Sequence, residues 1–310
     1  MERFIENHSG GKFDVIVIGG GITGASVAYE AATRGLKVAL MEKKDFSWAT
    51  SAVTSKMIHG GLRYLVNGEI GLVRESLRER RVMENIAPNF VYPWPIMMTH
   101  YKKPLKNNKW LVKLGMVVYD ALSYDKSFTW DPSKKIPMHK TISGPEVLRQ
   151  EPNVRAVDLT GASVFYDCVS IFPERFTLAF IKSALAYGAK VSNYTEVKGF
   201  LVDAHKKITG VQVIDLLHNS LHEVEAEVTI NCGGPWADLL LGIVQRNQTM
   251  SNTLRRSEGI HIITKKRLLS GRFTVGSLTP AGRHFFLIPW RNHTLIGTTD
   301  KPFDGNPDDY

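Results

Sequence analysis

The order of apolar and polar stretches divides the first forty residues into three elements. Residues 13–18 are almost continuously apolar, which predicts a buried strand. Residues 23–34 have the length and composition of a helix that ends at Gly35, and residues 36–42 predict a second buried strand. Strand, helix and strand in this order predict a βαβ unit of a parallel sheet that is covered on both faces.

Two longer helices are expected further along the chain. Residues 69–87 predict a charged helix whose apolar face includes Ile70. Residues 173–187 predict another helix, because they begin with proline and end before a glycine. Between the two helices, residues 93–145 are rich in proline, lysine and aromatic residues, which indicates an insertion outside the βαβ fold.

Strand patterns dominate the second half of the chain. A turn at residues 291–293 predicts a hairpin between residues 285–289 and 294–298. Further short strands are expected near residues 189–193, 196–202, 208–214 and 223–231.

Charge and cysteine content narrow the classes of partner. The 310 residues carry a formal net charge of +9, which favours anionic partners such as phosphorylated substrates or acidic lipid surfaces. No nucleic-acid-binding module is recognisable, so nucleic acid is not an expected partner. Cys168 and Cys232 form no CxxC pair, which argues against a disulfide scaffold, a metal site or a dithiol centre. Residues 1–12 lack the apolar core of a signal peptide, so we expect a cytoplasmic protein.

A GxGxxG motif lies between the first strand and the first helix. Gly19 permits a tight turn, Gly21 allows a pyrophosphate to approach the backbone, and Gly24 allows the helix to pack closely on the strand. Glu42 ends the second strand, where a carboxylate can accept hydrogen bonds from a ribose. The motif and its context predict a dinucleotide site.

The residues after this motif distinguish FAD from NAD. Residues 47–55 are rich in hydroxyl side chains and lead into a glycine pair, which suits a ligand that extends beyond its pyrophosphate, as FAD does. No second GxGxxG occurs, so NAD(P) is not the expected electron acceptor. We therefore predict an α/β fold with a Rossmann-like FAD-binding domain interleaved with a sheet-rich α+β substrate domain. The expected boundaries are 1–92 plus 170–242 for the first domain and 93–169 plus 243–310 for the second.

Several stretches resemble a known family. Residues 55–65, SKMIHGGLRYL, resemble the signature of FAD-dependent glycerol-3-phosphate dehydrogenases, within the D-amino-acid-oxidase-like superfamily. Residues 231–236, NCGGPW, resemble that family's flavin-contact turn Asn-Ala-Thr-Gly-Pro, although a threonine hydroxyl is lost here. Residues 286–290 and 296–300 resemble two of its later strands, and the resemblance extends over nearly the whole chain from Phe13.

The resemblance implies FAD as the cofactor. The residues expected to bind it are Gly19, Gly21, Ile22, Thr23, Gly24, Glu42, Thr50, Ser51, Ser55, Lys56, Gly60, Gly61, Val197 and Gly233. The family continues beyond the position of Tyr310 with a second arginine site and a segment that closes the flavin pocket. On this resemblance, residues 1–310 by themselves are expected to hold FAD weakly and to show no measurable dehydrogenase activity.

Alcohol oxidation requires loss of a hydride from carbon and of a proton from oxygen. His59 is the candidate base, and the alternative is a histidine that holds its loop by hydrogen bonds. Arg63 and Tyr64 are the candidate ligands of a substrate phosphate, whereas a solvated or salt-bridged arginine is the alternative. His261 and Arg283 match positions that the family places near substrate, although an ordinary strand residue is the better interpretation of each.

The resemblance implies oxidation of sn-glycerol 3-phosphate to dihydroxyacetone phosphate, with electrons passed to quinone at the inner face of a membrane. A related oxidase that uses oxygen or an amine substrate, and a non-catalytic FAD-binding protein, stay open, as does a homodimer. Residues 102–119 combine five lysines with an apolar run too short to span a bilayer. They predict a basic amphipathic element anchored by Trp110 in an anionic membrane surface, or else a core helix with a solvated lysine edge.

Overall fold

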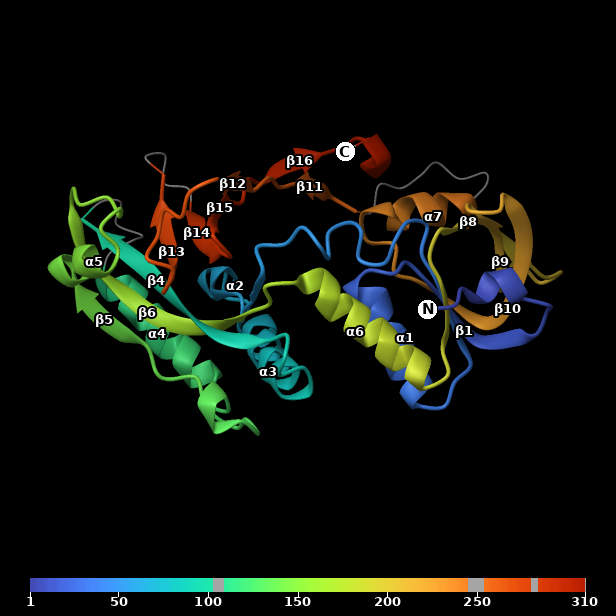
Figure 1. The fold of residues 1–310 in the computed structure, drawn as a ribbon, viewed down its shortest axis with the longest axis horizontal. Helices are drawn as coiled ribbons and strands as arrows, with labels where there is room; N and C mark the ends of the chain where they lie inside the picture. Colours follow the sequence, from blue (N-terminus) through green and yellow to red (C-terminus); the bar gives the residue numbers. More distant parts are fainter. Residues whose placement is uncertain (103–108, 245–253, 280–283, 310) are drawn as a thin grey trace. The chain divides into compact units, whose positions relative to one another are not determined.

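The computed structural model describes residues 1–102, 109–244, 254–279 and 284–309, apart from the side chains of Arg63 and Val66. The chain divides into two compact units, and the fold of each is α/β (Figure 1). The first unit consists of residues 1–54, 172–257 and 302–310, and the second of residues 55–171 and 258–301.

The first unit is built around a six-stranded sheet, counted over the described residues, in the order β7-β2-β1-β10-β9-β8. The first four strands are parallel to one another, as the βαβ pattern predicts, and β9 and β8 extend the sheet in antiparallel fashion. The strands are β1 (Lys12–Ile18), β2 (Val38–Met41), β7 (Lys190–Ser192), β8 (Thr195–Val202), β9 (Ile208–Asp215) and β10 (Ser220–Asn231). The helices are η1 (Phe4–Asn7), α1 (Ile22–Thr33), α6 (Pro173–Ala186), η4 (Gly234–Trp236), α7 (Ala237–Val244) and η5 (Pro307–Asp309).

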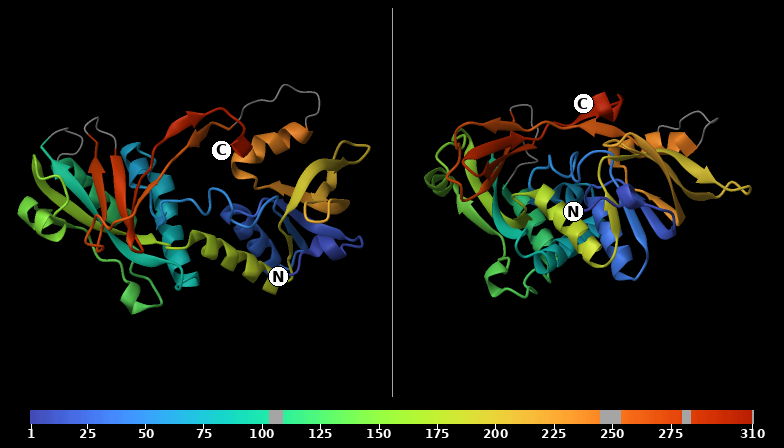
Figure 2. Two further views of the ribbon diagram at one scale, coloured as in Figure 1. Left: turned by 45° about the horizontal axis from the view of Figure 1, so that its top comes forward. Right: turned by 45° about the vertical axis from the view of Figure 1, so that its right-hand side comes forward.

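Helices α1 and α6 lie side by side, as Figures 1 and 2 both show. The buried face of α1 consists of small residues such as Ala25, Ala28 and Ala32, which allow a close approach of the helix backbone. The facing side of α6 supplies the larger apolar residues, including Phe176 and Phe180. The helix expected over residues 173–187 is therefore confirmed, with these two residues on its buried side.

The second unit contains an eight-stranded sheet, again counted over the described residues. Its main path runs β12-β15-β14-β13-β4-β6-β3, and β5 also pairs with β6. The strands are β3 (Met57–Ile58), β4 (Tyr92–Tyr101), β5 (Lys140–Ser143), β6 (Leu159–Val169), β12 (Ile262–Thr264), β13 (Thr274–Leu278), β14 (His284–Trp290) and β15 (His293–Gly297). The helices are α2 (Leu62–Val66), α3 (Ile70–Ile86), α4 (Lys109–Leu122), η3 (Pro132–Lys134) and α5 (Gly144–Gln150). Two further strands, β11 (Arg256–Glu258) and β16 (Lys301–Phe303), pair with each other.

The expected hairpin between residues 285–289 and 294–298 is confirmed. Strands β14 and β15 pair in antiparallel register from Phe286 opposite Gly297 to Trp290 opposite His293. Arg291 adopts a φ of 55° in the two-residue turn between them. Such a positive φ is typical of the tight turns that join antiparallel strands.

The domain boundaries differ from those expected. Residues 55–92 belong to the second unit rather than to the first, because Met57 and Ile58 pair with Val169 and Cys168 of β6. Helix α3, which follows this strand, packs its residues Val73 and Leu77 into the core of the second unit. Residues 302–310, expected in the second domain, belong to the first unit.

One apolar position of α3 was assigned to the wrong face. Ile70 is 53% exposed, whereas Val73 and Leu77 are buried. Ile70 is the first residue of the helix, so it lies before the turns that contact the sheet. The residues that fill the core on this side are Val73, Leu77, Ile96, Met116, Tyr119 and Phe165.

Helix α4 has two different faces. Met116 and Tyr119 point into the core, while Trp110, Leu114 and Val117 are 71%, 61% and 48% exposed. The segment is thus neither an ordinary core helix nor fully solvated. No helix among the described residues is long and apolar enough to cross a membrane.

The buried Glu84 of α3 makes the stability of the second unit depend on pH. Burial raises the pKa of Glu84 from 4.5 to about 7, although Arg80 and Lys134 oppose the shift. The folded state therefore binds this proton more tightly than the unfolded state, and the stabilisation is lost as pH rises from about 4.5 to about 7.

We expect Glu84→Gln, which resembles the protonated acid, to become more stable than the wild type as pH rises. The difference in unfolding free energy should grow by about 2–3 kcal/mol between pH 4.5 and pH 8. Urea unfolding at a series of pH values measures it, with the exposed Glu79 of the same helix changed to Gln as the control. A constant difference across this pH range would contradict the prediction.

Candidate cofactor and substrate sites

Two glycines of the GxGxxG turn, Gly19 and Gly24, are required by the backbone packing of the fold, independently of any ligand. Gly19 has a φ of 108°, and a Cβ added there would lie 2.5 Å from the carbonyl oxygen of Cys232. A Cβ on Gly24 would lie 1.9 Å from the carbonyl oxygen of Gly19. Side chains at these positions would separate α1 from the strands on which it packs. Gly24 accordingly lies under the turn, and it is not among the residues that line the cavity described below.

Gly21 differs from these two glycines because the protein does not require it. Its backbone, with φ −74° and ψ −179°, is accessible to any residue. A Cβ would meet only the hydroxyl oxygen of Ser51, at 3.1 Å. The absence of a side chain at Gly21 leaves the start of α1 open to a ligand, which is the fit expected for a pyrophosphate at a helix N-terminus.

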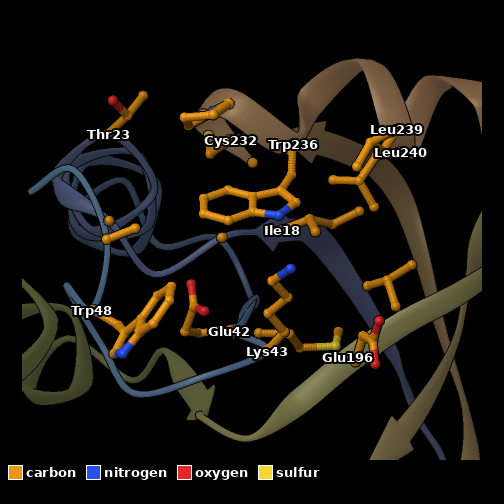
Figure 3. A pocket seen from close by; sticks show the side chains of 18 of the residues that line it. Ile18, Thr23, Glu42, Lys43, Trp48, Glu196, Cys232, Trp236, Leu239 and Leu240 are labelled. Carbon is orange, nitrogen blue, oxygen red and sulfur yellow. The ribbon is translucent and has the colours of Figure 1, made fainter. Parts of the chain in front are cut away.

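A cavity of about 410 Å³ opens beside this turn, within the first unit (Figure 3). Most of the residues expected to hold the dinucleotide end of the cofactor line it together. They are Gly19, Gly21, Ile22, Thr23, Glu42, Thr50, Ser51, Val197 and Gly233. These residues come from five separate stretches of the chain, and the sheet order brings them to one edge.

Backbone amides hold the carboxylate of Glu42 in place at the end of β2. One oxygen accepts a hydrogen bond from the Gly20 amide at 2.7 Å, and the other accepts one from the Lys44 amide at 2.8 Å. Each carboxylate oxygen can accept more than one hydrogen bond. The group can therefore accept a further bond from a hydroxyl in the cavity without rotating.

Ser51 contacts the first turn of α1 from the opposite side of the cavity. Its hydroxyl oxygen accepts a hydrogen bond from the amide of Ile22 at 2.9 Å. This bond satisfies one of the amides that a helix leaves without an intrahelical partner. Since the oxygen is the acceptor, the hydroxyl hydrogen can be donated toward an anion in the cavity.

The structure adds cavity residues that the sequence analysis did not identify. Asp308 accepts hydrogen bonds from the ammonium of Lys43 at 2.5 Å and from the indole of Trp236 at 2.9 Å. The same lysine lies 4.4 Å from the centroid of that indole. Figure 3 shows Lys43, Trp236 and Glu42 around the same space. Trp236 directly follows the NCGGP turn and could have been identified from it, whereas Asp308 carries no such signal.

The second unit brings together another group of the expected residues. The hydroxyl of Ser55 and the Nε2 atom of His261 share a hydrogen bond of 2.9 Å. Burial lowers the pKa of His261, and the positive charge of Lys56 adds to the effect. Lys56 is itself buried, with its ammonium 5.5 Å from the ring centroid of Trp290. A neutral imidazole beside a fixed cation is suited to accept or relay a proton.

His59 lies in an exposed turn of the second unit. Its Nδ1 accepts a hydrogen bond of 3.0 Å from the amide of Gly61, so the neutral ring carries its hydrogen on Nε2. In this form His59 can donate to a substrate oxygen, and it becomes a base only if the proton moves between the two nitrogens. The contact also fits the alternative in which His59 holds its own loop. Tyr64, which is 39% exposed, packs its ring against Gly61.

Some expected residues cannot be placed in the same detail. The backbone of Arg63 lies in α2, but its side chain falls outside the described part, and Arg283 lies outside the described residues altogether. Gly60 is buried against α3 and α4, away from solvent. Over the described residues, no group of three or more His, Cys, Asp or Glu side chains could hold a metal ion.

Comparisons with known proteins identify similar enzymes. Over 296 residues the chain is 33% identical to the aerobic glycerol-3-phosphate dehydrogenase of Staphylococcus epidermidis, covering 94% of this chain and 51% of that protein. It is 34% identical over 299 residues to the alpha-glycerophosphate oxidase of Enterococcus casseliflavus, covering 95% and 47%. The crystal structure of the glycerol-3-phosphate dehydrogenase from Bacillus halodurans complexed with FAD matches with a TM-score of 0.74 and 26% identity, covering 97% of this chain and 50% of that chain.

The chain spans about half the length of the curated relatives that it matches. A family model described as FAD dependent oxidoreductase matches residues 14–310. The matched span includes the glycine turn, the cavity and the Ser55–His261 contact. Since nearly the whole chain matches that model and the open position at Gly21 fits a pyrophosphate, this chain belongs to the family of FAD-dependent oxidoreductases.

Proposed function

We propose that this chain forms the cofactor-binding and substrate-binding part of an enzyme that oxidises sn-glycerol 3-phosphate to dihydroxyacetone phosphate. The observation that carries the proposal is Gly21, a glycine that only a closely approaching ligand requires, at the mouth of a cavity lined by Glu42 and Ser51. The substrate class comes from the relatives, which are named as a glycerol-3-phosphate dehydrogenase and an alpha-glycerophosphate oxidase.

In this proposal each unit has a separate task. The cavity of the first unit holds the adenosine and pyrophosphate groups, with Glu42 accepting from the ribose and Ser51 donating to a phosphate oxygen. In the second unit, Ser55, Lys56 and Gly61 are proposed to contact the flavin end, while Gly60, buried against α3 and α4, supports that loop from below. FAD supplies the acceptor for the hydride that leaves the substrate carbon.

Two imidazoles of the second unit are the candidates for handling the alcohol proton. His59, held with its hydrogen on Nε2 by the Gly61 amide, binds the substrate oxygen through that hydrogen, and it would act as the base only in the other tautomer, which gives up the Gly61 contact. His261, kept neutral by burial and by the nearby Lys56, is the second candidate and relays the proton through the hydroxyl of Ser55. The pKa of His261 is lowered, so neutral pH favours the form that can accept a proton.

The acceptor of the electrons in this proposal is a quinone in the membrane. The exposed apolar side chains Trp110 and Leu114 of α4, with the neighbouring Lys109 and Lys113, support attachment to an anionic lipid surface from the cytoplasmic side. The competing acceptor is oxygen, since one relative is named as an oxidase. Turnover with a short-chain quinone under argon, against hydrogen peroxide release in air, separates the two acceptors.

The proposed substrate is tested at Arg63. In a polypeptide that spans the length of the curated relatives, Arg63→Ala should weaken the use of glycerol 3-phosphate by about 1.5–3 kcal/mol in kcat/KM, the value of a hydrogen bond to a charged group. Dye-linked assays with glycerol 3-phosphate and with glycerol measure it.

Glycerol lacks the phosphate, so its turnover should not change in Arg63→Ala. Arg78→Ala is the matched control, because Arg78 is an exposed arginine of α3. Equal losses for the two substrates would mean that Arg63 is structural, and no glycerol 3-phosphate turnover by the unmodified polypeptide of the relatives' length would overturn the proposed function.

A further inference from the structure

A buried ion pair lies beneath the turn formed by His59, Gly60 and Gly61, which we call the His59–Gly61 turn. Arg80 of α3 and Asp167 of β6 are 1% and 2% exposed, and Nη1 of the arginine donates a hydrogen bond to Oδ1 of the aspartate. The expected cofactor and substrate residues include neither of them. Both belong to the second unit, as does the turn.

Tyr119 of α4 connects this ion pair to the turn. Its hydroxyl donates to the carboxylate of Asp167, at 2.9 Å and 2.8 Å from the two oxygens. The same hydroxyl oxygen accepts a hydrogen bond from the Gly60 amide at 2.9 Å, and Oδ1 of Asp167 lies 3.3 Å from that amide. Burial raises the pKa of Tyr119 well above 10, and the negative charge of Asp167 adds to this, so the hydroxyl keeps its hydrogen.

The direction of each hydrogen bond follows from the charge. Asp167 can only accept, so the tyrosine hydroxyl must donate to it, and a lone pair of its oxygen is then directed at the Gly60 amide. Arg80 donates to Oδ1 of Asp167 and holds the carboxylate in position. The antiparallel pairing of β3 with β6 ends at Ile58. Beyond that residue the Gly60 amide is bonded to the side chains of Tyr119 and Asp167 and not to the backbone of a paired strand.

The backbone at Gly60 packs so closely on these groups that no side chain fits there. A Cβ on Gly60 would lie 2.3 Å from Leu77 and 2.5 Å from the hydroxyl of Tyr119. The next residue, Gly61, has a φ of 73° and donates to the imidazole of His59. The position of the imidazole is therefore linked, through two consecutive amides, to the buried groups below.

Stability does not explain why the ion pair is there. The desolvation of two charges offsets most of their attraction, and a well-packed apolar pair is often at least as stable. We infer that Arg80, Asp167 and Tyr119 are positioning residues, which set the backbone of the His59–Gly61 turn and hold the His59 ring in its Nε2-protonated form. Their effect on turnover rests on the proposed function, whereas the hydrogen bond between the Gly60 amide and Tyr119 does not.

The test removes one oxygen atom, in Tyr119→Phe. We expect the Gly60 amide to exchange with solvent about tenfold faster, since a net hydrogen bond of this kind is lost, while amides in β6 keep their rates. We also expect the ¹⁵N shifts of the His59 ring to move from one dominant tautomer to a mixture. Tyr101→Phe is the matched control, because Tyr101 is a buried tyrosine whose hydroxyl donates to the carbonyl of Arg155.

A second variant, the double change Arg80→Met and Asp167→Asn, guards against misfolding because it removes both buried charges together, whereas Asp167→Asn alone would leave the charge of Arg80 unpaired. It removes the charge that orients the tyrosine hydroxyl, so it should give the same selective change at Gly60 and His59. An unchanged Gly60 rate, or an equal acceleration of the amides in β6, would overturn the inference. These measurements need neither cofactor nor substrate.

Turnover separates this inference from the proposed function. In a polypeptide of the relatives' length, Tyr119→Phe should lower kcat for glycerol 3-phosphate by about tenfold, the value of one hydrogen bond, and leave KM unchanged. A rise in KM with constant kcat would overturn the positioning role. Absence of turnover in the unmodified polypeptide of that length would instead refute the proposed function, and the exchange of the Gly60 amide would still decide whether Tyr119 holds the turn.

Discussion

Gly21→Val should abolish binding of FAD while the chain stays folded. The two methyl groups of valine would occupy the space that the pyrophosphate must approach, so the affinity should fall at least about 100-fold, or about 2.8 kcal/mol. The fold should tolerate the change, because the backbone of Gly21 is extended and a Cβ meets only the hydroxyl of Ser51, at 3.1 Å. Titration with FAD and with ADP, followed by calorimetry, measures the loss.

Two other glycines serve as controls for this experiment. Gly71→Val adds the same side chain in α3, where a Cβ meets nothing within 4 Å, and should not alter FAD affinity. Gly24→Val should instead prevent correct folding, because its Cβ would lie 1.9 Å from the carbonyl oxygen of Gly19. If the Gly21 variant bound FAD as tightly as the unmodified chain, the cavity beside α1 would not be the pyrophosphate site.

Replacement of Trp110 and Leu114 by glutamine should release the protein from vesicles that contain phosphatidylglycerol. Each exposed apolar side chain that becomes buried in lipid contributes about 1.5–3 kcal/mol, so the bound fraction should fall by about tenfold or more. Because the two side chains are 71% and 61% exposed, their loss should not affect the melting temperature. Vesicle sedimentation and thermal unfolding provide the two measurements.

The matched control changes an equally exposed tryptophan and leucine outside α4. Trp130 and Leu221 are 89% and 75% exposed, and their replacement by glutamine should leave vesicle binding intact. Raised salt should weaken the binding of the unmodified chain, because screening reduces the attraction between Lys109 or Lys113 and the anionic lipids. Early melting of the α4 variant, or equal release of the control, would place the membrane surface elsewhere.

The strand, glycine turn, helix and second strand at the start of the first unit could be predicted from local signals in the sequence. A continuous apolar strand, a glycine turn and a helix of small residues each depend on neighbours within a few positions, so residues 13–42 were interpreted correctly apart from the ends of the elements. The conformational reason for Gly19 and the packing reason for Gly24 follow from the turn itself. Glu42 was identified in the same way, because it ends the strand that the pattern predicts.

Tertiary structure alone decided which distant residues meet these local elements. Asp308 reaches Lys43 across 265 positions, and Asp167 reaches Gly60 across 107. No periodicity near either residue indicates its partner, since each hydrogen bond depends on which strands pair and in what register. The same reason explains the misplaced boundary: the two-residue strand Met57–Ile58 is too short to recognise, yet its pairing with β6 assigns the residues that follow to the second unit.

The amino terminus shows the same difference between local sequence pattern and tertiary contacts. Residues 1–12 are polar in composition, and their pattern predicts neither a helix nor a strand. In the structure Ile5 is fully buried in the core of the first unit, and Arg3 pairs with the buried Asp215 at 2.5 Å. The adjacent apolar pair Phe4 and Ile5 among polar residues shows no period to detect. A charge is buried only where the fold supplies the opposite one. Local pattern thus determined the glycine turn and the elements on either side of it, while the long-range pairing of strands decided the partners of each charged group.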